Sequence, residues 1–288
     1  MFYAYKPCID GFKHCKPIIY VDGIFLYDKY RSVLLTAEAV DENNCILPLA
    51  FALVEKESKD NWEYFMKMLR YYCCDRREHV CIISDRHIGI RHAMKQELWC
   101  ANAHRYCLRH VLSNYNTKFK NGAIKNLLDK AGREFQKRKF KRWLTKVELR
   151  HPDSKKWIDK IPIEKWTLAY DGGHRHGVMT TNYAESVNAM FKSIRAMPVT
   201  TLMQQLFMKL VDIFDQHRTE YSKLMNDGFL WTPKCAEILK HRLDKANGHV
   251  VQRYDEANMI FEIKTAFNHA RRKGGHKQIV DMKQKSCT

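Results

Sequence analysis

The sequence predicts an α/β protein built on a mixed sheet and continued by a long helical segment. Short β-branched runs fill the first hundred residues, and apolar residues recur at helical spacing between two of these runs. Strand patterns then vanish from Leu108 to about Ile161, where basic helical patterns replace them. With 45% hydrophobic and 28% charged residues the chain can bury a core, which excludes disordered, collagen-like and coiled-coil classes.

The first hundred residues predict three antiparallel strands followed by strands that are linked through helices. Asp41-Glu42-Asn43-Asn44 is typical of a hairpin turn between the second and third strands. Asp60 or Asn61 is the expected cap of the first helix. The expected elements are strands at Ile18–Asp22, Ser32–Val40 and Leu47–Val54, a helix to about Tyr72, a buried strand at Val80–Ser84, a helix at about Gly89–Leu98 and a strand at Ala103–Tyr106.

The remaining residues predict mainly helices. Gly122, Gly132 and Pro152 break the long helical segment, and its aromatic residues Phe119, Phe135, Phe140 and Trp143 are spaced to face a core. The elements expected after it are a loop at Trp166–Gly177, helices at Thr181–Ala196 and about Thr200–Met225, and a hairpin from Val250–Tyr254 and Met259–Ile263.

The charge indicates a polyanionic partner. Fifty Lys and Arg against 32 Asp and Glu give a net charge of +18, and cations placed on phosphates release condensed counterions. The segment Lys118–Lys156 alone holds fourteen basic against four acidic residues. A solvated helical face is the ordinary alternative, but DNA contact is favoured. The residues expected to contact DNA are Lys137, Arg138, Lys139, Lys141 and Arg142, a cluster that also fits a nuclear import signal.

Membrane and secreted classes do not fit the sequence. The longest apolar runs hold about eight residues, whereas a membrane-spanning helix needs about 20. Charged residues interrupt the apolar residues of the N-terminal segment, so it lacks the core of a secretory signal. Ten cysteines in a chain of this length do not predict a disulfide scaffold, and a reducing compartment is expected.

Two aspartates mark the predicted carboxyl ends of strands. Asp22 follows Ile18–Val21 and Asp85 follows Val80–Ser84, so the two carboxylates converge if these strands are neighbours. Glu185 on the predicted Thr181–Ala196 helix is a candidate third acid, and such a cluster suits two Mg²⁺ or Mn²⁺ ions in phosphoryl transfer. The ordinary alternatives are a turn at Asp22-Gly23 and a capping box between Asn182 and Glu185.

Motifs in one order along nearly the whole chain resemble the plant MuDR/MULE (Mutator-like element) transposase domain. The motifs are Tyr20-Val21-Asp22-Gly23, Val33–Ala37, Pro48–Glu55, Asn61-Trp62, Ile83–Ile90, His104–His110, Ala169–Gly173, Met179–Asn188 and Arg195–Pro198. The resemblance implies an RNase H-like mixed sheet flanked by helices, with a helical insertion between the second Asp and the Glu. It also implies a D-D-E triad of Asp22, Asp85 and Glu185 and Mg²⁺-dependent cleavage and strand transfer at transposon ends.

The same resemblance assigns Cys107 and His110 to the family's C-x-x-H motif. We interpret them as supporting the site, together with Asn182 and Asn188, which flank Glu185. From chemistry alone, Cys100, His104, Cys107 and His110 would also suit zinc, but a structural role is favoured.

The resemblance divides the chain into five parts. Full-length relatives carry an N-terminal DNA-binding region and a SWIM zinc finger, of which Cys287 alone would remain, so we expect no zinc finger and a truncated copy. The parts are an N-terminal remnant at 1–16, the first part of the RNase H-like core at 17–107, a basic helical insertion at 108–180, C-terminal catalytic helices at 181–247, and a hairpin with the start of a truncated SWIM finger at 248–288.

These features favour a DDE-type DNA transposase catalytic domain that is Mg²⁺- or Mn²⁺-dependent and nuclear, with a decayed or inactive copy left open. The alternative is a domesticated, non-catalytic protein that binds DNA and regulates transcription, and an inert product is the third reading. The expected partner is double-stranded DNA of transposon terminal repeats, not a membrane. Assembly of several copies on that DNA stays open.

Overall fold

The computed structural model describes residues 1–27, 31–74, 77–100, 103–179, 195–267, 274–284 and 286–287. The chain divides into two compact units, Met1–Lys223 and Leu224–Thr288. Within the described ranges, no helix is both long enough and apolar enough to cross a membrane.

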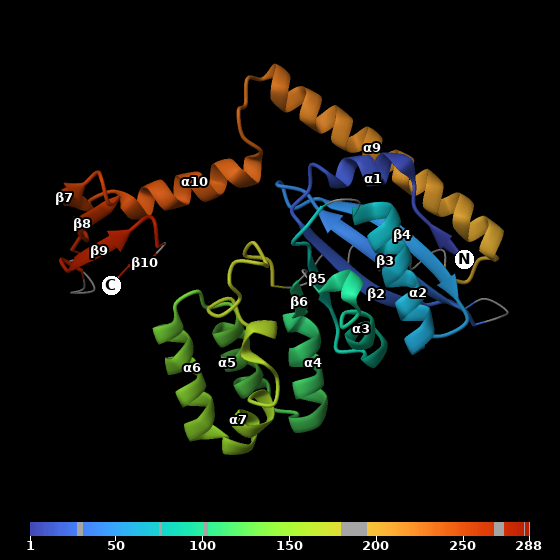
Figure 1. Ribbon diagram of the computed structural model, residues 1–288, viewed down its shortest axis with the longest axis horizontal. Helices are drawn as coiled ribbons and strands as arrows, with labels where there is room; N and C mark the ends of the chain where they lie inside the picture. The colour runs from blue at the N-terminus through green and yellow to red at the C-terminus, as the bar shows by residue number, and fades with distance from the viewer. Residues whose placement is uncertain are drawn as a thin grey trace. The chain divides into compact units, whose positions relative to one another are not determined.

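A six-stranded mixed sheet forms the centre of the first unit in its described part (Figure 1). β2 pairs antiparallel with β3, β3 with β4 and β4 with β1, whereas β2, β5 and β6 run parallel. In spatial order the strands are β1 (Phe2–Tyr3), β4 (Ile46–Val54), β3 (Val33–Val40), β2 (Ile18–Phe25), β5 (Cys81–Ser84) and β6 (Ala103–Tyr106).

The middle strands of this sheet are apolar because both of their faces are covered. All eight residues of β3 and all four of β5 are buried. One continuous core joins the strands to Trp62 and Phe65 of α2 and to Leu206 of α9. The helices that supply this cover are α1 (Lys6–Phe12), α2 (Lys59–Leu69), α3 (Ile88–Ala93) and α9 (Val199–Asn226), with α1 beside α9 in Figure 1.

Several predicted boundaries were wrong. The cap of α2 is Ser58, whose hydroxyl accepts a hydrogen bond from the Asn61 amide at 3.2 Å, rather than Asp60 or Asn61. The predicted extent of this helix to about Tyr72 agrees with the structure, where α2 continues past Leu69 as a π-helical turn, Arg70–Cys74. The helix expected at Gly89–Leu98 ends at Ala93 and is followed by a 3₁₀ turn, Glu97–Trp99.

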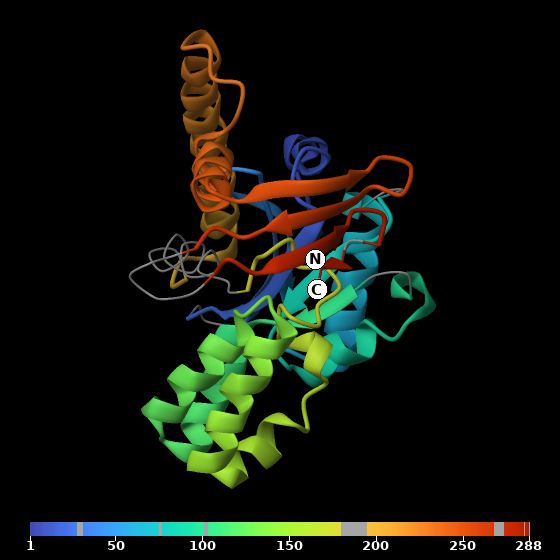
Figure 2. The ribbon, with the colours of Figure 1, turned by 90° about the vertical axis from the view of Figure 1, so that its left-hand side faces the viewer.

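The predicted helical insertion forms a bundle with its own core (Figure 2). Its helices are amphipathic, and Leu108, Tyr115, Leu128 and Phe140 lie in the shared core. Phe135, which was expected to face the core, is 69% exposed because it lies in the turn before α6. The elements are α4 (Leu108–Phe119), α5 (Gly122–Gly132), α6 (Lys137–Arg150), α7 (Pro152–Ile158) and a 3₁₀ turn, Ile163–Lys165.

The second unit contains a helix and a small antiparallel sheet. The predicted hairpin is present as β7 and β8, and its sheet extends in the order β10-β9-β8-β7. The elements are α10 (Pro233–Ala246), β7 (Val250–Asp255), β8 (Ile260–Lys264), β9 (Lys277–Asp281) and β10 (Ser286–Cys287).

The architecture of the first unit is α/β, with a mixed sheet flanked by helices as the sequence predicts. It is compatible with an RNase H-like fold. The strand order places β2 next to β5, and this pairing positions the two predicted aspartates.

Candidate functional site

The two predicted aspartates lie on neighbouring parallel strands. β2 and β5 pair with Ile18 opposite Cys81 and Tyr20 opposite Ile83, and the same offset aligns Asp22 with Asp85. Neighbouring strands are about 4.8 Å apart, so both carboxylates originate from one part of the sheet. Asp85 follows the last residue of β5, as predicted. Asp22 does not end its strand: it is the fifth residue of β2, because β2 continues along β3 to Phe25.

The Asp22 carboxyl group lies in an environment that resists its ionisation. Burial raises its pKa, and the nearby charge of Asp85 raises it further. Three groups oppose this effect: the positive charges of His110 and Arg109, and the Gly23 amide, which donates to Asp22 Oδ1 at 3.0 Å. Asp22 and Asp85 are therefore close enough to repel each other, and a cation between them would relieve that repulsion.

Asp85 also shapes the chain that leads into α3. Its Oδ1 accepts a hydrogen bond from the His87 amide at 2.9 Å, which is an ordinary turn role. His87 then caps α3, because its Nδ1 accepts from the Gly89 amide at 3.1 Å. The turn fixes the direction of the Asp85 side chain next to the strand end.

Glu57 is an acid of this site that the sequence analysis missed. Burial raises its pKa, and among its neighbours Asp85 and Asp22 raise it while His87 lowers it. Glu57 Oε2 lies 3.6 Å from His87 Nε2. A Cβ atom added at Gly23 would lie 2.0 Å from Glu57 Oε1. Because glycine has no side chain, the Glu57 carboxylate can occupy this space. Gly23 beside Asp22 was the one sequence signal, since Glu57 itself lies in a charged loop of ordinary composition.

Glu38 is a second missed acid, buried in β3 beside the strand that carries Asp22. Its side chain is 1% exposed, and burial raises its pKa to about 8. A hydrogen bond with the Thr36 side chain opposes this rise, and the charge of Asp22 adds to it. Within the described residues Glu38 Oε2 has no hydrogen-bond partner. The protonated acid is therefore the favoured form of Glu38 at neutral pH.

Cys107 and His110 lie next to the two aspartates. The Cys107 amide donates to the Ser84 carbonyl at 2.7 Å, which places the start of α4 beside the end of β5. A hydrogen bond with Cys107 raises the pKa of His110, and burial opposes this. Because the charge of His110 acts on Asp22, the pair lies in the site's surroundings, where the sequence analysis expected a supporting role.

The residues that would complete a metal centre are not described. Glu185, Asn182 and Asn188 lie outside the described residues. In the ranges that are described, no three His, Cys, Asp or Glu side chains are grouped so that they could hold a metal ion. The alternative zinc set of Cys100, His104, Cys107 and His110 is therefore not assembled.

The basic residues predicted to contact DNA form an exposed surface on α6. All five, Lys137, Arg138, Lys139, Lys141 and Arg142, are exposed. Half-buried Trp143 lies on the same helix, with Lys146 Nζ 4.5 Å and Lys130 Nζ 5.4 Å from its ring centroid. The cations and the exposed part of the ring together suit a nucleic-acid backbone and its bases.

A comparison with protein families gives a match that contains both aspartates. Residues 18–114 match the family model of the MULE transposase domain. The match includes Asp22, Asp85, Cys107 and His110, whereas Glu185 and the basic residues of α6 lie beyond it. A comparison with curated proteins finds no match. The resemblance to Mutator-like transposases is therefore confirmed for residues 18–114, which are similar to the MULE transposase domain.

Proposed function

We propose that the chain is the catalytic domain of a DDE-type DNA transposase, which cleaves DNA at transposon ends and joins the ends to new DNA. The observation that carries this proposal is the alignment of Asp22 and Asp85 across β2 and β5, inside the segment that matches the MULE transposase domain. A transposase domain acts on DNA, and the basic surface on α6 supports DNA as the partner. The proposed DNA is double-stranded and comes from the terminal repeats.

Asp22, Asp85 and Glu185 are the residues that would hold two Mg²⁺ or Mn²⁺ ions. The donor chemistry fits, because carboxylate oxygens are hard ligands and Asp22 lies where a second negative charge is unfavourable without a cation. When bound, such ions activate a water molecule or a 3′-hydroxyl group and stabilise the leaving oxygen. Glu57 adds negative charge close to both aspartates, while His110 and Arg109 supply positive charge near Asp22. We propose a nuclear location, with the α6 cluster as the import signal.

The test is cleavage of supercoiled plasmid DNA by the purified chain in the presence of Mn²⁺ or Mg²⁺. We expect nicking by the wild type and its loss, by at least about a hundredfold, in Asp22→Asn, Asp85→Asn and Glu185→Gln. Asp60→Asn is the matched control, since Asp60 is an exposed acid outside the site. Equal nicking by all four variants would contradict the assignment of the triad.

A second candidate function is a domesticated protein that binds DNA without cutting it. One observation favours it: Asp22 accepts a hydrogen bond from the Gly23 amide and Asp85 accepts one from the His87 amide, local roles that need no metal. This function predicts a salt-dependent shift of DNA in an electrophoretic assay, unchanged in Asp22→Asn, together with no nicking under any metal condition. Metal-dependent nicking that Asp22→Asn abolishes would exclude it.

A further inference from the structure

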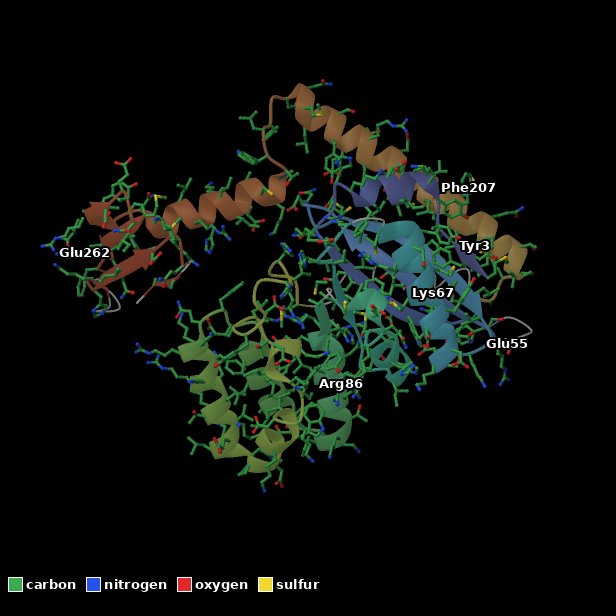
Figure 3. All side chains as sticks on the ribbon, viewed as in Figure 1. Tyr3, Glu55, Lys67, Arg86, Phe207 and Glu262 are labelled. Atoms are coloured by element: carbon green, nitrogen blue, oxygen red, sulfur yellow. The ribbon has the colours of Figure 1, made fainter. Side chains whose placement is uncertain are left out.

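A basic cavity lies at the edge of the sheet formed by β6, and one of its lining residues directly follows Asp85 in the chain. Its volume is about 490 Å³, within the range of small-molecule sites. Arg86, which directly follows Asp85, lines the cavity and reaches toward the helical insertion, with its guanidinium 5.9 Å from the Trp157 ring centroid (Figure 3). α3, β6 and the 3₁₀ turn Ile163–Lys165 supply most of the other lining residues.

The lining carries a large excess of positive charge. Glu164 is the one acid among the described lining residues. Within the ranges that the structure describes, none of the lining cations except Arg105 forms an ion pair with a carboxylate. The lining cations are Arg86, Arg91, Lys95, Arg105, Lys160 and Lys165.

Burial and, to a lesser extent, the neighbouring positive charges shift the pKa of two groups of the cavity. Burial lowers the pKa of Lys165, and the positive charge of Arg105 lowers it further. Burial also lowers the pKa of His104, to about 3, and Lys165 contributes to that shift. Cations gathered at this density repel one another unless an anion lies between them.

The wall of the cavity is fixed by buried polar contacts. Arg105 donates through Nε to Asp171 Oδ1 at 2.8 Å, and His104 Nε2 lies 2.9 Å from Ser84 Oγ. Arg105 is 9% exposed and His104 7% exposed. The wall is therefore built before any ligand arrives, which reduces the entropy that binding costs.

The lining also includes surfaces that suit the organic part of a nucleotide. Met94, Ile161 and Pro162 contribute apolar surface, and Lys165 Nζ lies 5.3 Å from the centroid of the Tyr106 ring. A volume of this size exceeds the need of a lone phosphate ion and accommodates a phosphate with its sugar and base.

We propose that this cavity binds the phosphorylated end of a single DNA strand, with the terminal phosphate among Arg91, Lys95 and Lys165. A terminal phosphate carries a charge of about −1.5 to −2 at neutral pH, against −1 for an internal phosphodiester, so crowded cations favour the end of the strand. Because Arg86 follows Asp85 directly, the bound end lies beside the catalytic aspartates. The inference rests on the proposed function, since that function makes DNA the ligand.

The test measures binding of fluorescent single strands of about ten nucleotides, with and without a 5′-phosphate, by anisotropy in EDTA. We expect the wild type to bind the phosphorylated strand about tenfold more tightly. Arg91→Ala/Lys95→Ala and the single variant Lys160→Ala should reduce this preference, the former to near unity. Arg91, Lys95 and Lys160 are exposed, so these variants keep the fold.

The matched control is Lys59→Ala/Lys67→Ala, which removes the same charge from exposed positions of α2 and should retain the preference. Inorganic phosphate and 5′-AMP serve as competitors, and we expect 5′-AMP to compete better because it also fills the nucleotide part of the cavity. Equal binding of both strands by the wild type, equal loss in the control, or competition by inorganic phosphate at the level of 5′-AMP would overturn the proposal. The assay contains no metal, and Asp22→Asn should keep the preference for the phosphorylated strand. The binding result therefore does not depend on whether the chain is catalytically active.

Discussion

Glu38 links the acidic site to the stability of the sheet. Its folded pKa of about 8 lies above its ordinary value of 4.5, so between these values the folded chain holds a proton that the unfolded chain has lost. The free energy of unfolding should therefore fall as pH rises from about 4.5 to 8, by up to about 1.4 kcal/mol per pH unit.

Urea denaturation across this pH range checks the prediction for Glu38, with Glu38→Gln as the comparison. The amide keeps the size of the side chain and cannot ionise, so this part of the pH dependence should disappear in the variant. The same slope in wild type and variant would show that Glu38 does not hold the proton.

At the residue scale, the sequence predicted acids at the ends of strands but not the acids that fold in beside them. Asp85 and Asp22 could be recognised because each follows an apolar run. Glu38 lies inside β3, where all of the other residues are buried, and Glu57 lies in a loop. Neither position therefore has a sequence pattern that indicates an acidic site. Their proximity to Asp22 depends on strand register and on the space above Gly23, which emerge only in the folded chain.

At the scale of elements, the crossing of α2 and α3 positions the turn that contains Asp85. Gly89 makes this contact possible, because a Cβ atom there would lie 2.7 Å from Trp62 Cδ1 and 3.0 Å from the Ser58 carbonyl oxygen. We expect Gly89→Ala to lower the free energy of unfolding by roughly 1–3 kcal/mol, since a buried ring and a backbone atom must move.

Gly122→Ala is the matched control for the crossing, because a Cβ atom at Gly122 meets nothing within 4 Å at the exposed start of α5. This variant should be neutral or slightly stabilising. Chemical denaturation of both variants measures the difference. Equal stability of Gly89→Ala and Gly122→Ala would show that α2 and α3 can move apart without lowering the free energy of unfolding.

Element types followed from periodicity, whereas element ends depended on local partners. The alternation and apolar runs of β3, β4 and β5 are strong enough to predict strands. The apolar face of α2 is likewise strong enough to predict a helix. The extension of β2 to Phe25 results from its pairing with β3. The early end of α3 at Ala93 and the cap by Ser58 are set by the loops around them.

At the scale of the molecule, a buried ion network joins the loop at the end of the helical insertion to the edge of the sheet. Asp171, 2% exposed, accepts from Arg105 Nε at 2.8 Å and from the Arg175 amide at 2.6 Å. We expect Asp171→Ala to cost roughly 3–5 kcal/mol, because two buried guanidinium groups lose their carboxylate. Thermal unfolding measures this cost.

Asp153→Ala, which removes an exposed acid of α7, is the control. Equal melting temperatures of the two variants would refute the structural role of the network.

The positive charge of the chain gives a second prediction at this scale. Neutralising the α6 cluster with Lys137→Gln, Lys139→Gln and Lys141→Gln should weaken DNA binding and reduce its dependence on salt. The logarithmic slope should fall by about 0.9 for each DNA phosphate that a lysine no longer neutralises. Titrations at several salt concentrations measure the slope. An unchanged slope would mean that this exposed face does not bind the DNA backbone.

Charge excess and the helical insertion were both readable from the sequence, because they are properties of composition and periodicity over many residues. The cavity at β6 could not be predicted, since its cations come from three separate segments: Arg91 from α3, Arg105 from β6, and Lys160 and Lys165 from the residues after α7. Nothing in their spacing predicts that the fold gathers them at one sheet edge.

The pairing of Asp22 with Asp85 as a cation site is tested most directly by thermal unfolding with and without Mn²⁺. The wild type should gain several degrees in melting temperature when Mn²⁺ is added, because the ion binds the folded chain and not the unfolded one. Asp22→Asn should gain much less, and in EDTA it should melt at or above the wild-type temperature, since the amide removes a buried charge that repels Asp85. An equal gain for both proteins would contradict a cation site built on Asp22.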